Sequence, residues 1–248
     1  MFGIFQRVPR TTYEDYSKSH IAHDKGKNYD SHFSKYKYRK LMWKLEKKLL
    51  KRLSLNNNEH LDFACGTGRI LSVINSPKKT GIDISPSMIE VCRDKVKAAR
   101  LIVGDFRENN FFETKFDLIT AFRFLPNAES SLRNDAFAFF KKNLKEDGFL
   151  VFNNHRSFWS FSYIFFRFLG YDSFREGMSH GEVLNLTREY GFKIVKIYSL
   201  GLIPQTDKKS IFPFFLTKFI ENLNLCYFSQ FHYFGYNNIY VCTTKKFI

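Results

Sequence analysis

Residues 60–71, HLDFACGTGRIL, constrain the fold of this chain more than any other stretch. The letters HLDF predict a short, largely buried strand, which runs into a turn that contains Gly66 and Gly68. An amphipathic helix is predicted to follow from Arg69. Glycines let such a turn bring backbone N–H groups close to a ligand, and the start of a helix adds the positive end of a dipole. The stretch therefore predicts a ligand-binding strand–turn–helix unit.

Two common ligand classes fit this turn poorly. The dinucleotide fingerprint needs a third glycine where this chain has Leu71, and a P-loop needs a Gly-Lys-Ser/Thr triplet that is missing. The remaining pattern, D-x-x-x-G-x-G, resembles motif I of the class I S-adenosylmethionine-dependent methyltransferases. The resemblance implies that the cofactor contacts Asp62, Ala64, Gly66 and Gly68, with the carboxylate toward a cationic group. A purely structural loop is the alternative that this turn leaves open.

A second strand is predicted over residues 79–83, KTGID, and it ends in Asp83. This acid follows the last glycine of the turn by 15 residues, close to where a βαβ unit places the carboxylate that accepts from two ribose hydroxyls. A helix is predicted to begin after Ser85. The segment GIDISPSMIEVCR resembles motif II of the same family, which implies that Ile84 and Met88 flank the adenine. Plain core packing is the alternative for these two side chains.

A third apolar strand is predicted over residues 101–107, LIVGDFR. In the resembling family, the acid at this strand end takes the adenine amino group, and the next residue lies against the ring. Gly104, Asp105 and Phe106 are therefore candidate cofactor residues. Three acids now end three successive strands, and doubly wound sheets bind ligands at those carboxyl ends. The ordered series is a stronger signal than any single acid.

The fourth predicted strand, residues 116–121, leads into Phe122, which joins the candidate cofactor residues. The family resemblance places this segment beside the transferred methyl group. It lacks the Pro-Pro-aromatic motif of enzymes that methylate exocyclic base amines, which weighs against that reaction. Arg123 could hold a carboxylate or phosphate through two hydrogen bonds, or form a surface ion pair. Asn127 could bind the substrate or cap the following helix.

A helix over residues 131–145, a turn, and a fifth strand over residues 148–153 are predicted next. His155 follows that strand and should lie on the same rim of the sheet as the acids. Because the unperturbed histidine pKa lies near neutral pH, His155 could take the proton of an attacking hydroxyl. The alternative is a histidine that only hydrogen-bonds loop backbone.

Residues 1–58 are predicted to form an N-terminal basic helical lid or arm, and residues 59–248 the methyltransferase domain. The first segment holds 14 Lys and Arg against 5 Asp and Glu. Leucines at spacing four predict an amphipathic helix over about residues 39–54. The resemblance implies that an upstream part, around Tyr29, closes over the cofactor. A solvated arm is the alternative.

Two aromatic insertions, at about residues 155–180 and 199–236, interrupt the second half of the predicted domain. Both are too short or too charged to span a bilayer. They are expected to pack together above the sheet and to shape the acceptor pocket. Contact with a membrane surface is the alternative.

Composition narrows the partners without selecting one. Lys and Arg outnumber Asp and Glu by 39 to 24, so the net charge of +15 favours an anionic partner such as a phosphorylated acceptor, a membrane surface or nucleic acid. The four cysteines are far apart and predict neither a disulfide framework nor a metal site. We expect a cytoplasmic protein, with the inner face of the membrane as a further expectation.

The resemblance implies an α/β, Rossmann-like, mostly parallel sheet of seven strands in the order 3-2-1-4-5-7-6, with strand 7 antiparallel and helices on both faces. The implied cofactor is S-adenosyl-L-methionine, which leaves as S-adenosyl-L-homocysteine, and no metal is expected. The segments FRFLPNAE and FNNH look similar to bacterial methyltransferases that act on sugars. We therefore predict O-methylation of a saccharide, glycolipid or polysaccharide. An RNA methyltransferase, a methyltransferase of another small molecule and a non-catalytic binding protein are the alternatives.

Overall fold

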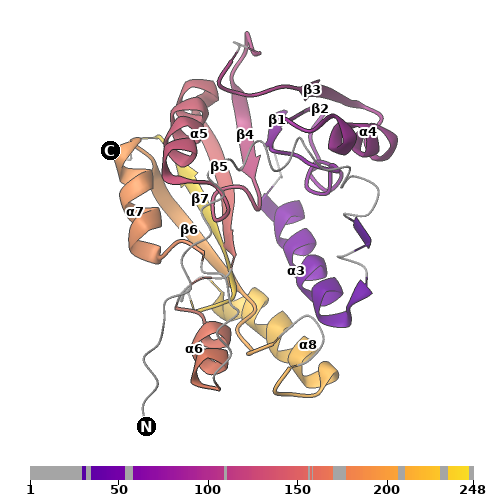
Figure 1. The fold of residues 1–248 in the computed structure, drawn as a ribbon, viewed down its shortest axis with the longest axis vertical. Helices are drawn as coiled ribbons and strands as arrows, with labels where there is room; N and C mark the ends of the chain where they lie inside the picture. Colours follow the sequence, from indigo (N-terminus) through magenta and orange to yellow (C-terminus); the bar gives the residue numbers. More distant parts are fainter. Residues whose placement is uncertain are drawn as a thin grey trace.

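Seven strands form one sheet in the order β3-β2-β1-β4-β5-β7-β6 (Figure 1). The pairs among β1 to β5 are parallel, and β7 runs antiparallel between β5 and β6. The strands are β1 (Glu59–Phe63), β2 (Lys78–Asp83), β3 (Ala99–Val103), β4 (Phe116–Ala121), β5 (Leu144–His155), β6 (Lys193–Leu200) and β7 (Asn237–Thr243). The fold predicted from the sequence is confirmed. This computed structural model describes residues 30–31, 35–53, 58–108, 111–155, 157, 159–169, 177–205, 210–229 and 234–245.

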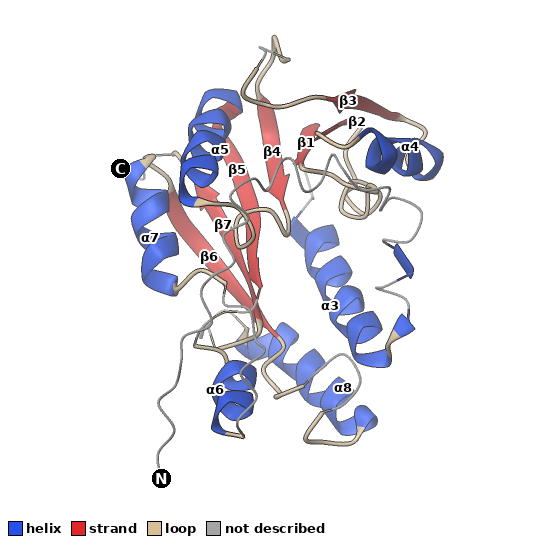
Figure 2. Ribbon diagram, in the orientation of Figure 1, coloured by secondary structure: helices blue, strands red, loops and turns tan. Residues whose placement is uncertain are grey.

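Helices cover both faces of the sheet (Figure 2). They are α3 (Lys37–Leu53), α4 (Pro86–Lys95), α5 (Ser130–Asn143), α6 (Phe161–Phe168), α7 (His180–Glu189) and α8 (Phe214–Leu223), which continues into the π-helix η1 (Asn224–Phe228). On one face, Phe152 of β5 packs with side chains of α5 and α7. On the other face, Val151 packs with leucines of α3. Because successive side chains of a strand point to opposite faces, β5 supports both layers.

The helix predicted from Arg69 is not regular in the structure, so this prediction is wrong in its geometry. Residues 66–73 form a series of turns, in which Ser72 N–H donates to the Gly68 carbonyl over 2.9 Å and Ile74 N–H to the Ile70 carbonyl over 3.2 Å. Only nine residues separate Gly68 from β2, and one of them is Pro77. The segment still covers the sheet, because its isoleucines join the α3 side of the core.

The turn predicted before β5 is also wrong, because the strand already begins at Leu144. Leu144 pairs with Phe116 of β4, and a register shift follows before the next pair. The Lys145 ammonium donates to the Asp117 carboxylate over 2.8 Å across the same two strands. Burial of Leu144 and this cross-strand ion pair extend β5 through a polar stretch that reads as a turn.

The helix α3 is part of the core of the sheet. Its buried leucines, Leu41, Leu45, Leu49 and Leu50, pack against Leu118 and other residues of β4, β5, β6 and β7. The predicted helix is confirmed within two residues at its N-terminal end and one at its C-terminal end. The division at residue 58 stays a prediction, and Tyr29 lies outside the described residues.

The two aromatic insertions meet at one end of the sheet, where α6 and α8 lie near each other (Figure 1). Both pack on the segment that follows β6. Ser162 of α6 donates its hydroxyl to the Ile203 carbonyl over 3.5 Å, and Glu221 of α8 accepts from the Ile203 backbone over 2.8 Å. Since β5 ends and β7 begins at this same end, the insertions stand next to the predicted rim of the site.

Candidate active site

The two glycines of the turn differ in the space around them. Ala64, Gly66 and Gly68 all have positive φ, at 52°, 53° and 72°. A Cβ added at Gly66 would meet nothing within 4 Å, whereas one at Gly68 would stand 2.5 Å from the Cys92 sulfur. Gly66 therefore leaves the ligand side of the turn open, and Gly68 lets α4 pack close behind it.

A pocket opens beside the turn, at the carboxyl ends of β1, β2 and β4, and its empty space including the mouth is about 760 Å³. It brings together ten of the residues predicted from the sequence, namely Ala64, Gly66, Asp83, Ile84, Met88, Gly104, Asp105, Phe106, Phe122 and Arg123. It adds three that were missed, namely Phe63, Ile82 and Phe124. Asp62, Gly68, Asn127 and His155 do not line it.

The Asp83 carboxylate is held in place by two backbone donors. The Gly66 N–H donates to Oδ2 over 2.8 Å, and the Ser85 N–H donates to Oδ1 over 2.9 Å. Each oxygen has a further lone pair, and the residue lines the pocket. An oriented carboxylate of this kind can accept from two neighbouring hydroxyls.

Asp105 also lines the pocket, and its carboxylate is held by Arg107. The guanidinium donates to both carboxylate oxygens, with a shortest distance of 2.5 Å, and the Arg107 N–H donates over 3.0 Å. These hydrogen bonds lower the pKa of Asp105, so it is ionised at neutral pH. Phe106 packs edge-on against Phe63, with ring centroids 4.8 Å apart, and gives the pocket an aromatic floor.

Asp62 lies behind the turn and is almost fully buried. Thr120 donates its hydroxyl to Asp62 Oδ1 over 2.7 Å, and the His60 ring lies 2.8 Å from the same hydroxyl. Burial raises the pKa of Asp62 to about 7 and lowers that of His60 to about 3. The described surroundings thus make Asp62 a support of the turn, and its predicted contact with the cofactor stays a prediction.

Arg123 belongs to a closed ring of polar side chains at the rim of the pocket. Its N–H donates to Asn153 Oδ1 over 2.6 Å, and its guanidinium donates to the buried Glu46 over 2.7 Å. Asn237 donates to the other Glu46 oxygen over 2.9 Å and accepts from Asn153 over 2.8 Å. With φ at 62°, Arg123 has a strained backbone that this ring holds. The ring joins α3 to the ends of β4, β5 and β7.

Asn127 and His155 stand at the same rim. Asn127 donates to the Arg123 carbonyl over 2.5 Å, and the cap of α5 is Glu129, so the capping alternative for Asn127 is wrong. His155 ends β5 opposite Asn237, is partly buried, and shares the face of the strand with Asn153. Their roles with an acceptor stay predictions.

Glu46 is the main site residue that the sequence reasoning missed. It is the one acid among the 17 residues of α3, which also contains eight Lys and Arg. It sits between two leucines that are buried against the sheet. A lone carboxylate on the apolar face of a basic helix was the available signal for a buried partner.

The chain matches a family model described as a methyltransferase domain over residues 61–148. The match contains the glycine turn and the three acids at the ends of the first three strands. It confirms the family resemblance inferred from those motifs for this part of the chain.

A curated relative gives a second similarity. The chain is 31% identical to malonyl-[acyl-carrier protein] O-methyltransferase of Acetivibrio thermocellus, over 51% of this chain and 45% of that protein. The chain spans less than half the length of the curated relatives that it matches.

Solved structures agree on the fold. An S-adenosylmethionine-dependent methyltransferase from Thermotoga maritima superposes with a TM-score of 0.65 at 17% identity, and the match covers 91% of this chain and 100% of that one. N-methyltransferase NodS from Bradyrhizobium japonicum, in complex with S-adenosylhomocysteine, gives 0.57 at 16% identity, with 93% and 97% covered. At these identities the likeness shows the fold, which is the class I methyltransferase fold.

Proposed function

We propose that this chain, which carries a class I S-adenosylmethionine-dependent methyltransferase domain, transfers a methyl group from that cofactor to a sugar hydroxyl. The observation that carries the proposal is the pocket at the carboxyl ends of β1 to β4, which is lined by an oriented Asp83, an ionised Asp105 and apolar side chains. Methyltransferases with this domain give S-adenosylhomocysteine as the second product.

The residues of the pocket fit the cofactor. The open side of Gly66 leaves room for the methionine part, and Asp83 has the lone pairs needed for both ribose hydroxyls. Ile84, Met88 and Phe106 offer an apolar slot of the kind that holds adenine. Their arrangement before any ligand enters reduces the entropy that binding has to overcome.

The cofactor, when bound, supplies a methyl group on a positively charged sulfur, which is electrophilic without help from the protein. The protein therefore has to align the acceptor and remove its proton. We assign proton removal to His155, a ring nitrogen of which would take the proton of the acceptor hydroxyl. The ring of Glu46, Arg123, Asn153 and Asn237 fixes the rim along which the acceptor lies.

The exposed apolar surface favours a lipid-linked acceptor. Of the large hydrophobic side chains exposed in the described part of the chain, all but Val103 and Phe149 lie on or beside α6, α8 and η1. They are Trp159, Phe161, Ile164, Phe168, Leu169, Ile211, Phe212, Phe215, Phe219, Leu223, Tyr227 and Phe228. Apolar surface gathered in this way is typical of partner or membrane contact.

We therefore propose a location at the inner face of the membrane, where a glycolipid acceptor would reach the rim of the site. No helix within the described ranges has the length and apolarity that crossing a bilayer requires. Contact through the surface of α6 and α8 needs no such helix, because aromatic side chains bind at the level of the lipid headgroups.

Methyl transfer is tested by incubating the protein with cofactor that carries a radioactive methyl group and with lipid-linked saccharides extracted from bacterial membranes. The proposal expects label in the lipid-linked fraction, released as an O-methylated sugar on acid hydrolysis. His155→Ala should lower this rate by roughly 10²–10⁴ with little change in cofactor affinity. Label found in RNA, in a protein or in a small acid would contradict the proposed acceptor.

A further inference from the structure

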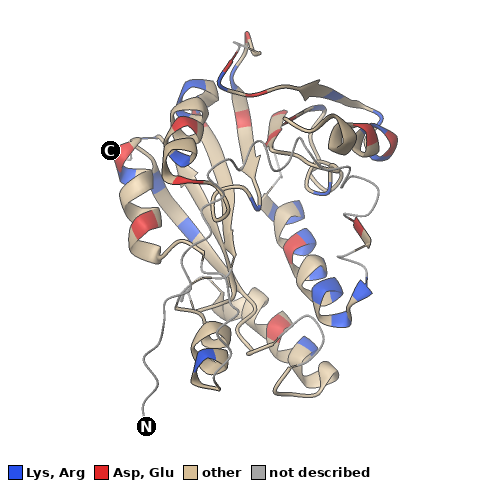
Figure 3. Ribbon diagram, in the orientation of Figure 1, with Lys and Arg blue, Asp and Glu red and all other residues tan. Residues whose placement is uncertain are grey.

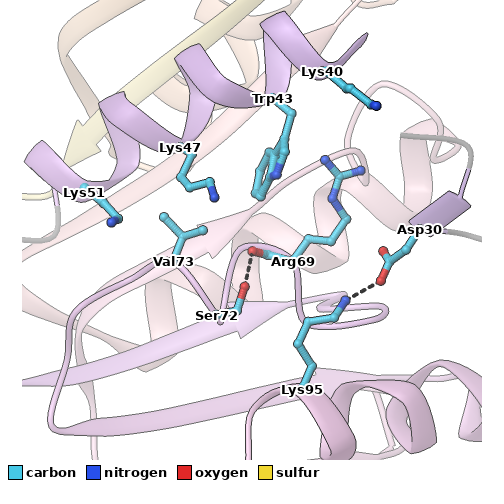
Figure 4. Close-up of a pocket in the computed structure, with 9 residues that line it drawn as sticks. All are labelled: Asp30, Lys40, Trp43, Lys47, Lys51, Arg69, Ser72, Val73 and Lys95. Atoms are coloured by element: carbon cyan, nitrogen blue, oxygen red, sulfur yellow. Dashed lines mark hydrogen bonds and ion pairs between the residues drawn. The ribbon is translucent and has the colours of Figure 1, made fainter. Parts of the chain in front are cut away.

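A second hollow lies between α3 and the segment that follows the glycine turn (Figure 4). Its empty space including the mouth is about 880 Å³. We call it the lysine pocket, and it is lined by Asp30, Lys40, Trp43, Lys47, Lys51, Arg69, Ser72, Val73 and Lys95. It shares no lining residue with the pocket beside Gly66. The turn segment contributes to both hollows, so they lie close to each other without being one site.

The lining is strongly positive. It contains five cationic side chains and one carboxylate, Asp30. The Asp30 carboxylate already pairs with the Lys95 ammonium and accepts a hydrogen bond from the Thr67 hydroxyl over 2.8 Å. The Lys95 ammonium also donates to the Thr67 carbonyl over 2.8 Å. Lys40 and Lys47 form no ion pair with any acid in the described part of the chain. Positive charge therefore remains in excess in the lysine pocket.

The cations come from facing elements. Lys40, Lys47 and Lys51 follow each other along one side of α3, and Figure 3 shows how basic this helix is. In Figure 4 the side chains of Trp43 and Lys47 extend from α3 toward the segment that carries Arg69, and Lys40 and Lys51 lie at the two ends of the hollow. The Arg69 guanidinium lies 4.3 Å from the centroid of the Trp43 ring, and the Lys47 ammonium lies 5.9 Å from the same centroid. Trp43 thus holds two cations at one place in the hollow.

We propose that the lysine pocket binds the phosphate groups of a small ligand, with a diphosphate as the best fit. The exposed ammonium groups of Lys40 and Lys47 can donate charge-assisted hydrogen bonds to a phosphate, and the Arg69 guanidinium, stacked on Trp43, adds positive charge beside them. Like charges gathered in one hollow repel each other, and a multivalent anion relieves this repulsion. A concave site with facing cations suits a compact anion better than the extended backbone of a nucleic acid. The inference stands apart from methyl transfer, because phosphate binding can be measured without cofactor.

The test uses Trp43 as the reporter. The chain has two tryptophans, so Trp159→Phe leaves the fluorescence of Trp43 alone. Titration of this variant with inorganic pyrophosphate at constant ionic strength should give a saturable change in emission. Adding Lys40→Gln and Lys47→Gln should weaken pyrophosphate binding by about tenfold or more, since each removes a charge-assisted hydrogen bond.

The matched control is a second double variant, Lys44→Gln with Lys48→Gln, made in the same Trp159→Phe background. Lys44 and Lys48 are exposed on the same helix and lie outside the lining of the lysine pocket. Their substitution removes the same total charge as the substitution of Lys40 and Lys47. Pyrophosphate affinity should stay unchanged in this control, and cofactor affinity should stay unchanged in both double variants. Equal weakening by the two pairs, absence of saturation, or tighter competition by an RNA oligonucleotide than by pyrophosphate would each overturn the proposal.

Discussion

Two acids at the ends of neighbouring strands have opposite environments. Asp83 lines the pocket and accepts from two backbone N–H groups, whereas Asp62 is buried behind the turn against Thr120. The same residue type, two register positions apart on paired strands, thus lines the pocket in one case and lies among buried partners in the other. The hydrogen-bond partners and the burial of each carboxylate account for this difference.

Asp83→Asn should weaken binding of S-adenosylmethionine by roughly 10- to 100-fold, because hydrogen bonds to a charged group contribute about 1.5–3 kcal/mol each. Calorimetric titration measures the effect. Asp94→Asn, an exposed position of α4 with the same change in charge, is the control and should leave affinity unchanged. Equal affinity in Asp83→Asn and the wild type would remove Asp83 from the ribose site.

Asp62 and His60 give opposite dependences of stability on pH. The folded pKa of Asp62, about 7, lies above its ordinary value, so its contribution favours the folded state at low pH and is lost as pH rises toward 7. The folded pKa of His60, about 3, lies below its ordinary value of 6.5, so its contribution is lost as pH falls from 6.5 toward 3. Between about pH 4 and 6.5 the two effects oppose each other.

Asp62→Asn should therefore be more stable relative to the wild type at pH 7 than at pH 4. The difference is on the order of 4 kcal/mol at most, from about three pKa units at 1.36 kcal/mol each. Urea unfolding of both proteins at several pH values measures it. A difference in unfolding free energy that is constant across this range would show that the pKa of Asp62 is not raised in the folded protein.

At the scale of elements, the ring around Glu46 ties the N-terminal helix to the site. The described contacts of Arg123 join α3 to the end of β4, and Asn237 brings in the start of β7. The ion pair is buried on the Glu46 side, and the Arg123 side chain is 22% exposed. Loss of one partner therefore leaves a partly buried charge behind.

Glu46→Gln should destabilise the protein by about 1–3 kcal/mol, below the full penalty for a broken buried pair because Arg123 is partly solvated. Adding Arg123→Gln should recover part of that loss, and a double-mutant cycle measures the coupling. Glu46→Gln should also lower methyl transfer more than cofactor affinity. Additive effects of the two substitutions would show that the pair is not coupled.

The sequence predicted well where short-range patterns coincide with burial. The segment KTGID predicted the strand that ends in Asp83, the apolar run before Asp105 predicted the next strand, and the glycine turn predicted a ligand pocket beside it. The irregular segment after Gly68 was missed because its apolar spacing fits a helix, whereas only nine residues, Pro77 among them, separate Gly68 from β2. The ring around Glu46 joins residues up to 191 positions apart, so no local pattern contains it.

At the scale of the whole molecule, the basic helix α3 borders the apolar surface of α8 and η1: the Lys37 ammonium lies 5.4 Å from the centroid of the Phe214 ring, and Lys48 donates to the Cys226 sulfur over 3.9 Å. The lysine pocket lies beside α3, and the exposed aromatic side chains lie on α6, α8 and η1 at the end of the sheet where β5 ends. The proposed lipid contact and the proposed anion site therefore use different side chains.

Phe168→Ser combined with Phe215→Ser should lower co-sedimentation with vesicles that contain anionic lipid several-fold, because these side chains are 88% and 74% exposed. Cofactor affinity should not change. Val103→Ser, an exposed apolar position on β3, is the control and should leave vesicle binding as it was. Vesicle binding that survives the loss of both phenylalanines would contradict the membrane contact.

The most direct test of the central claim is calorimetric titration of the wild-type protein with S-adenosylmethionine, S-adenosylhomocysteine and NAD. We predict micromolar binding of the two adenosyl ligands and no binding of NAD, because the turn has Leu71 where the dinucleotide fingerprint needs glycine. Binding of NAD, or no heat with either adenosyl ligand, would contradict the assignment of the pocket beside Gly66 to the methyl donor.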